Sequence, residues 1–103
     1  MSEHKDFITK TVKDNSVVVF MKGTVDFPMC GFSGRAVQVL KASGAEKICG
    51  VNCLEDADLR NAVKEFSDWP TLPQIYIKGE FIGGGDIVSE MGQSGELSKL
   101  LAK

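Results

Sequence analysis

The segment Cys30-Gly31-Phe32-Ser33 places a single thiol between an apolar run and a stretch with helical spacing. A cysteine that begins a helix lies beside unpaired backbone N–H groups and the positive end of the helix dipole, which together stabilise a thiolate. Ser33 stands where a Cys-x-x-Cys motif has its second sulfur, and a serine cannot resolve a disulfide. The spacing therefore predicts nucleophilic or metal-binding chemistry at one thiol, with the second thiol coming from another molecule. These residues also allow a simpler interpretation, in which Cys30 is a small core residue that begins a helix.

The other two cysteines, Cys49 and Cys53, lie in a segment that resembles a strand. Their Cα atoms would then be about 13 Å apart, which exceeds the separation of about 4.4 to 6.8 Å that a disulfide requires. We expect packing roles for both. The only histidine, His4, stands in a polar N-terminal stretch and is expected to be solvated. No pair of residues has the close spacing of a mononuclear zinc site.

The chain of 103 residues, 43% hydrophobic and 25% charged, is long enough for one compact domain over residues 1–103. A net charge of -2 predicts no nucleic-acid partner. No apolar run approaches the roughly 20 residues that cross a bilayer, so no membrane association is expected. The polar residues 1–13 do not resemble a signal peptide, and the cysteine count is odd. Both features favour a reducing compartment, cytoplasmic or the mitochondrial matrix, over secretion.

Hydrophobic periodicity predicts the order of helices and strands. Helices are expected over residues 5–14, 30–43 and 56–67, and strands over residues 17–21, 46–52, 74–78 and 80–82. Asp86 and Ser94 are suitable N-caps for two short terminal helices. A strand-helix-strand unit implies parallel strands, and a hairpin adds antiparallel ones. The sequence therefore predicts an α/β architecture, a four-stranded mixed sheet flanked by helices. This is the thioredoxin fold, with the thiol at the C-terminal end of the first strand.

Short motifs stand in a fixed order along nearly the whole chain. They are Lys22-Gly23-Thr24, Pro28-Met29-Cys30-Gly31-Phe32-Ser33, Leu54-Glu55-Asp56 with Leu59-Arg60, Trp69-Pro70-Thr71-Leu72-Pro73, and Gly83-Gly84-Gly85-Asp86. Each motif alone is weak, but their order and spacing together are highly specific. With these motifs the chain closely resembles the monothiol glutaredoxins of the CGFS type.

For this family the resemblance implies a 2Fe-2S cluster bridged between two protomers. Cys30 of each protomer and the glutathione bound to each protomer would supply four thiolate ligands. Cys30 is therefore the expected reactive residue and metal ligand, and the 2Fe-2S cluster and glutathione are the expected cofactors. The expected partners are a second copy of the chain, apo iron-sulfur proteins and BolA-type proteins.

The resemblance also implies a glutathione site formed by five residues. Lys22 and Arg60 would hold the glycine carboxylate, and the backbone of Leu72 would pair with the cysteine of glutathione beside a cis peptide bond at the next proline. Gly85 and Asp86 would bind the γ-glutamyl end, since a helix N-terminus attracts its carboxylate and an acid its ammonium. Without the motifs, the two cations would be solvated surface residues, and the Gly85-Asp86 pair a flexible loop and a plain N-cap.

Three functions fit these features. The leading hypothesis is an iron-sulfur carrier that passes a labile cluster to apo-proteins by ligand exchange. The alternative is a glutathione-dependent thiol-disulfide oxidoreductase that removes glutathione from protein thiols through Cys30. Ser33 and the loop at residues 23–29 argue against fast turnover, and Gly85 stands where many relatives have a cysteine that can pair with the active thiol. A thioredoxin-fold interaction module without a cofactor would leave the glutathione motifs unused.

Overall fold

The strand β1 (Val17–Met21) organises the fold, because all five of its side chains are buried. Side chains of a strand alternate between its two faces. Accordingly, Val17, Val19 and Met21 belong to one hydrophobic core, and the two residues between them belong to another. A strand that is apolar on both faces needs a covering layer on each side. The continuous apolar run in the sequence is therefore the signal for a central strand.

The computed structural model describes residues 2–102 and contains a four-stranded sheet with the strand order β2-β1-β3-β4. The strand β2 (Cys49–Asn52) pairs with β1 in parallel. The strand β3 (Gln74–Ile77) pairs with the other edge of β1 in antiparallel orientation, and β4 (Glu80–Gly83) forms a hairpin with β3. The predicted four-stranded mixed sheet is confirmed.

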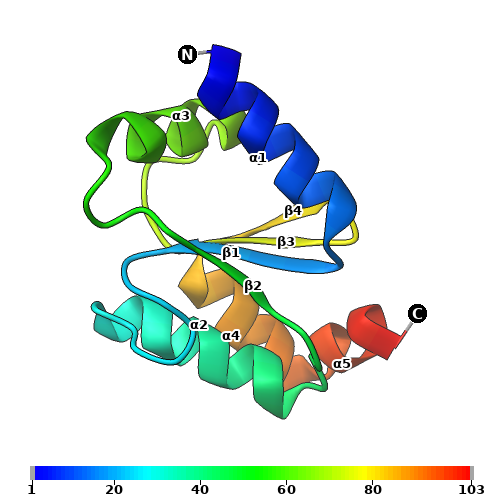
Figure 1. Ribbon diagram of the computed structural model, residues 1–103. Coiled ribbons are helices and arrows are strands. Elements are labelled where there is room, and N and C mark those ends of the chain that lie inside the picture. The colour runs from blue at the N-terminus through cyan, green and yellow to red at the C-terminus, as the bar shows by residue number, and fades with distance from the viewer. Residues whose placement is uncertain (1, 103) are drawn as a thin grey trace.

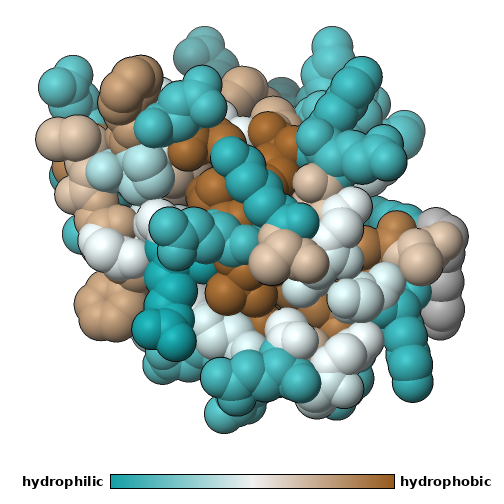
Figure 2. Space-filling view, turned by 90° about the horizontal axis from the view of Figure 1, so that it is seen from below, coloured by the Kyte–Doolittle hydropathy of each residue, from teal (hydrophilic) through white to brown (hydrophobic). Residues whose placement is uncertain are grey.

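Helices cover both faces of the sheet (Figure 1). One face carries α1 (Ser2–Asp14) and α3 (Ala57–Ser67), and the other carries α2 (Gly31–Ala42) and α4 (Gly85–Ser94), with α5 (Glu96–Ala102) beside α4. Seen from the side of α2 and α4, polar side chains cover much of the surface, and apolar side chains show between them (Figure 2). No helix within residues 2–102 has the length and apolar character required to cross a membrane.

Some element boundaries differ from those expected. The second strand begins at Cys49 instead of residue 46, because Cys49 already lies opposite Val18 and little of β1 remains for earlier residues to pair with. The first helix begins earlier than expected, at Ser2. Asp56 caps α3 as expected, since its side chain accepts a hydrogen bond from the backbone N–H of Leu59 at 3.0 Å.

The predicted N-cap at Asp86 is wrong. The cap of α4 is Gly84, whose backbone is extended, so Asp86 lies inside the first turn of the helix. Ser94 is the last residue of α4, and its hydroxyl accepts a hydrogen bond from the backbone N–H of Glu96 at 3.3 Å. Both glycine and aspartate are suitable N-cap residues, and an acid is also favourable in the first turn. The residue types alone therefore do not show whether the helix is capped by Gly84 or by Asp86.

Of the two cysteines outside the motif, Cys49 is the first residue of β2 and Cys53 follows its last residue. Cys53 is fully buried in the core beneath α1 and α3, and burial raises the pKa of its thiol to about 11. Cys49 is partly buried and packs against the same core, and both thiols are free. Packing roles therefore account for both. The imidazole of His4, expected to be solvated, is instead half-buried close to the start of α3.

Candidate functional site

Cys30 is the N-cap residue of α2 and follows the loop that leaves β1. Its backbone is extended, with φ -146° and ψ 134°, and its carbonyl accepts the first helical hydrogen bond from the N–H of Gly34 at 3.0 Å. Its side chain makes no capping hydrogen bond. The thiol is half-buried, so it stands at the surface next to the first N–H groups of the helix. The helix predicted to begin with the thiol is confirmed.

The pKa of the Cys30 thiol is lowered from its ordinary value. The largest cause is the nearby backbone N–H of Ser33, which favours the charged form without the geometry of a capping hydrogen bond, and partial burial opposes it. The N–H of Phe32, the charge of Lys22 and the hydroxyl of Ser33 lower the pKa further. Hydrogen bonds to the charged form and a nearby cation both favour a thiolate. Cys30 is thus a stronger metal ligand and nucleophile near neutral pH than a free cysteine.

Ser33, which stands in the place of the second cysteine of a dithiol motif, has a structural role. It is fully buried, and its Oγ accepts a hydrogen bond from the backbone N–H of Lys22 at 3.3 Å. The hydroxyl proton is then available for the Cys30 sulfur. Ser33 therefore joins the end of β1 to the first turn of α2 and stabilises the thiolate at the same time.

A groove of about 410 Å³ is lined by Lys22 and Phe32, two residues that also act on the Cys30 thiol, although Cys30 itself is not among the lining residues. Two backbone segments form its walls: residues 69–73, which connect α3 to β3, and residues 84–87 at the start of α4. Side chains of Lys22, Phe32 and Lys64 complete the lining. The groove thus contains two cations and one acid, Asp86, which is exposed.

Four of the five predicted glutathione-binding residues line this groove: Lys22, Leu72, Gly85 and Asp86. The Leu72-Pro73 peptide bond is cis, as the family resemblance implies. A Cβ atom on Gly85 would lie 3.7 Å from the Phe32 carbonyl oxygen and from Pro73, which is ordinary contact. The backbone at Gly85 therefore leaves room for a side chain, and the lack of a second thiol there is not imposed by packing.

Arg60, the fifth residue, does not line the groove. Its Nη1 donates hydrogen bonds to the carbonyl oxygens of Cys53, at 2.8 Å, and of Leu54. It therefore ties α3 to the segment that follows β2. Its expected contact with a glutathione carboxylate stays a prediction.

Sequence reasoning missed Lys64, which follows Arg60 by one helical turn in α3 and faces the groove. Residues four apart share a helix face, so the spacing from Arg60 was the available signal. It also left the role of Trp69 open. Trp69 lines the groove, and its indole Nε1 is buried without a hydrogen-bond partner and close to Gly84. A Cβ at Gly84 would lie 3.2 Å from this Nε1, so the indole leaves little room for a side chain there.

Gln74 was also missed, although it is a polar residue at the start of an otherwise apolar strand. Its side chain is fully buried in β3. The amide Nε2 donates hydrogen bonds to the carbonyl oxygens of Trp69, at 3.0 Å, and Thr71, at 3.1 Å. These bonds attach the groove wall at residues 69–73 to the sheet.

The glutaredoxin family pattern matches residues 17–82, and the chain belongs to the glutaredoxin family. Curated relatives are monothiol glutaredoxins. A mitochondrial monothiol glutaredoxin-5 of Lachancea kluyveri is 51% identical over 102 residues, covering 97% of this chain and 71% of the relative. A probable monothiol glutaredoxin 2 of Rickettsia typhi is 52% identical over 103 residues, covering 98% and 92%.

Solved structures confirm the thioredoxin fold. Reduced apo GrxS14 of poplar superposes with a TM-score of 0.83 at 51% identity, covering 95% of this chain and 89% of that chain. A buckwheat glutaredoxin-glutathione complex superposes with a TM-score of 0.84 at 25% identity, covering 98% and 89%. The motifs identified in the sequence thus belong to the family that they resemble.

The lowered pKa of Cys30 predicts its reactivity with iodoacetamide. The alkylation rate of Cys30 should rise with pH around a midpoint below the value of about 8.5 of a free cysteine. Lys22→Met should move the midpoint upward by a few tenths of a pH unit, because the thiolate loses a neighbouring cation. Lys10→Met, an exposed change on α1, is the matched control. Peptide mass spectrometry after timed alkylation gives the rates, and a Cys30 midpoint at or above that of a free cysteine would contradict the assignment.

Replacing Gln74 tests the attachment of the groove wall. Gln74→Met keeps the side-chain length but leaves the carbonyls of Trp69 and Thr71 without a donor, which should cost about 1–3 kcal/mol of unfolding free energy. Urea denaturation measures this loss, and the emission of Trp69, the only tryptophan in the chain, reports on the wall itself. Gln38→Met, at an exposed position of α2, should change neither quantity. Unchanged stability and emission in Gln74→Met would refute the attachment.

Proposed function

We propose that this chain is an iron-sulfur carrier of one glutaredoxin domain. Two copies, each with a bound glutathione, hold one 2Fe-2S cluster between them and pass it to apo-proteins. The observation that supports this proposal best is the single thiol of lowered pKa, Cys30, beside a groove whose charges complement glutathione.

The charges of the groove match those of glutathione, which has two carboxylates and one ammonium. Lys22 and Lys64 provide cations for the glycine carboxylate. The start of α4 at Gly85 provides free N–H groups for the γ-glutamyl carboxylate, and Asp86 provides an acid for the ammonium. With these contacts, the glutathione thiol would lie between the two walls, near Leu72. The buckwheat relative that binds glutathione supports this reading.

The donor atoms of the chain fit a shared cluster. A 2Fe-2S cluster takes four sulfur ligands, and Cys53 is buried with a raised pKa while Cys49 lies in β2. Cys30 is only partly buried, stands at the start of a helix and has a lowered pKa. Two chains and two glutathione molecules therefore complete the ligand set. Cys30 and the glutathione thiol are also the ligands that exchange during transfer.

The surface around Cys30 suits a protein partner. Phe27, Met29 and Phe32 are 77%, 66% and 68% exposed and lie within three residues of the thiol in the sequence. Exposed apolar groups gathered at one place favour protein contact. We propose that a second copy, a recipient apo iron-sulfur protein or a BolA-type protein docks here. The compartment is a reducing one, cytoplasmic or the mitochondrial matrix, as the free cysteines and the mitochondrial relatives support.

The rival function is thiol-disulfide exchange, which the lowered pKa of the Cys30 thiol favours. The Cys30 thiolate would attack the glutathione sulfur of a protein–glutathione mixed disulfide. The S–S bond of that disulfide breaks, a Cys30-glutathione disulfide forms, and the protein thiol is released. A second glutathione must then attack this disulfide, because Ser33 has no sulfur and Gly85 has no side chain. We expect this last step to be slow, so the chain functions mainly as a carrier.

Cysteine substitutions test the proposed ligation. Cys30→Ser should abolish the visible absorption of protein reconstituted anaerobically with iron, sulfide and glutathione, because each chain then lacks its single protein ligand and the cluster loses two of its four thiolates. Cys49→Ala and Cys53→Ala are the matched controls and should retain the wild-type iron and sulfide content. A Cys30→Ser protein that holds iron and sulfide at the wild-type ratio would disprove the assignment.

A further inference from the structure

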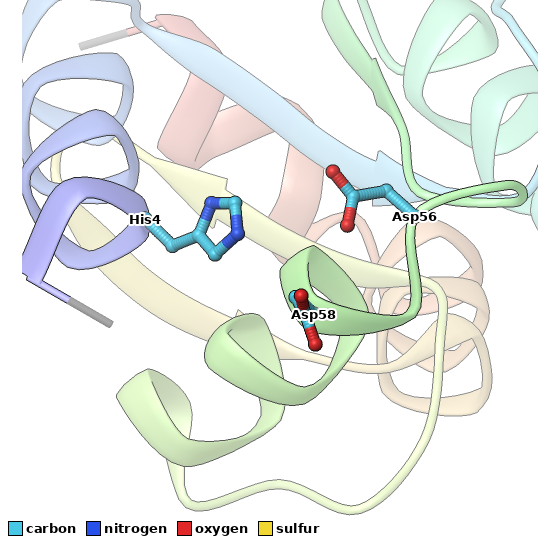
Figure 3. A group of neighbouring side chains, drawn as sticks. All are labelled: His4, Asp56 and Asp58. Atoms are coloured by element: carbon cyan, nitrogen blue, oxygen red, sulfur yellow. The ribbon is translucent and has the colours of Figure 1, made fainter.

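Three side chains with metal-binding atoms meet between the first turns of α1 and α3 (Figure 3). His4 lies in the first turn of α1, Asp56 is the N-cap of α3, and Asp58 lies in the first turn of α3. One ligand atom from each lies within 4.8 Å of the others. His4 is half-buried and the two acids are exposed. The fold therefore joins a nitrogen donor and two oxygen donors that are far apart in the sequence.

We propose that His4, Asp56 and Asp58 bind one divalent first-row metal ion, such as Mn²⁺ or Fe²⁺. One imidazole and two carboxylates are a ligand set for such ions, with water at the remaining positions. Atoms that share a metal at about 2.1 Å lie roughly 3 to 4 Å from one another. The three ligand atoms lie within 4.8 Å of one another, so rotations of the two exposed carboxylates would bring them to this separation.

The arrangement differs from a group of surface acids in two respects. The imidazole comes from a separate helix, so an ion would link α1 to α3. Asp56 is also oriented in advance, because its Oδ1 accepts a hydrogen bond from the N–H of Leu59 at 3.0 Å. The two carboxylates carry a charge that a divalent ion neutralises, which outweighs the partial positive charge of the α3 N-terminus.

None of these three residues lines the groove. The helices α1 and α3, which carry the three residues or begin beside them, lie on the face of the sheet opposite α2, which begins after Cys30 (Figure 1). Binding of an ion would fasten the first turn of α1 to the start of α3 and stabilise the folded chain by mass action. The proposal does not depend on glutathione or on an iron-sulfur cluster.

A titration with Mn²⁺ tests the proposal in a Cys30→Ser background, where the reactive thiolate is absent. His4 is the only histidine, so the imidazole C–H proton signals belong to it alone. Substoichiometric Mn²⁺ should broaden these signals selectively, and the Tm should rise with Mn²⁺ concentration. His4→Ala should abolish the Tm rise.

Carboxylate variants distinguish coordination of the ion by Asp56 and Asp58 from non-specific electrostatic binding at the surface. Asp56→Asn, which keeps the helix cap, and Asp58→Asn should each weaken Mn²⁺ binding at least tenfold. Glu80→Gln, at an exposed position of β4, is the charge-matched control and should bind like the parent protein. Equal broadening in the Asp variants and the control, or no saturable broadening up to millimolar Mn²⁺, would overturn the proposal.

Discussion

The burial of β1 on both faces is the constraint on which the rest of the structure depends. Its side chains enter two cores, so β1 has a single register against β2 and β3. The chain leaves its carboxyl end at Lys22, whose N–H is bound to Ser33 in the first turn of α2. The N-terminus of α2 is therefore attached to the end of the central strand. Cys30 receives its helix N–H groups and its neighbouring cation from this one junction.

The groove depends on the same sheet. Gln74 opens β3, which pairs with β1, and its buried amide attaches residues 69–73 to the strand. The opposite wall begins where β4 ends and α4 starts, so the β3–β4 hairpin connects the two walls. Lys22 and Lys64 approach from β1 and α3. The groove is thus assembled from segments that only the tertiary fold brings together.

Much of this fold could be predicted from the sequence, because its strongest signals are local. The apolar run at Val17–Met21 and the helical spacing of apolar residues after Cys30 both indicate which side chains are buried, and both patterns lie within a few consecutive residues. The cap of α4 was misplaced, since Gly84 and Asp86 both suit a helix start. Contacts across the fold leave no local pattern. The approach of His4 to Asp56 was therefore found only in the structure.

The site could be predicted in part for the same reason. Motif spacing identified Lys22, Leu72, Gly85 and Asp86, which line one groove, but it could not show that Arg60 turns toward backbone carbonyls after β2. Arg60 and Lys64 are one turn apart on the same face of α3, so their spacing alone does not show which of the two side chains reaches the groove. That choice depends on how α3 packs against the sheet, and Lys64 is the one that lines the groove.

Native mass spectrometry of the anaerobically reconstituted protein tests the central claim most directly, because the mass counts every component of the assembly. The account predicts a species with two chains, two glutathione molecules and one 2Fe-2S cluster, which separates into monomers when glutathione is removed. A cluster held by a single chain, or a cluster-bound dimer without glutathione, would contradict it.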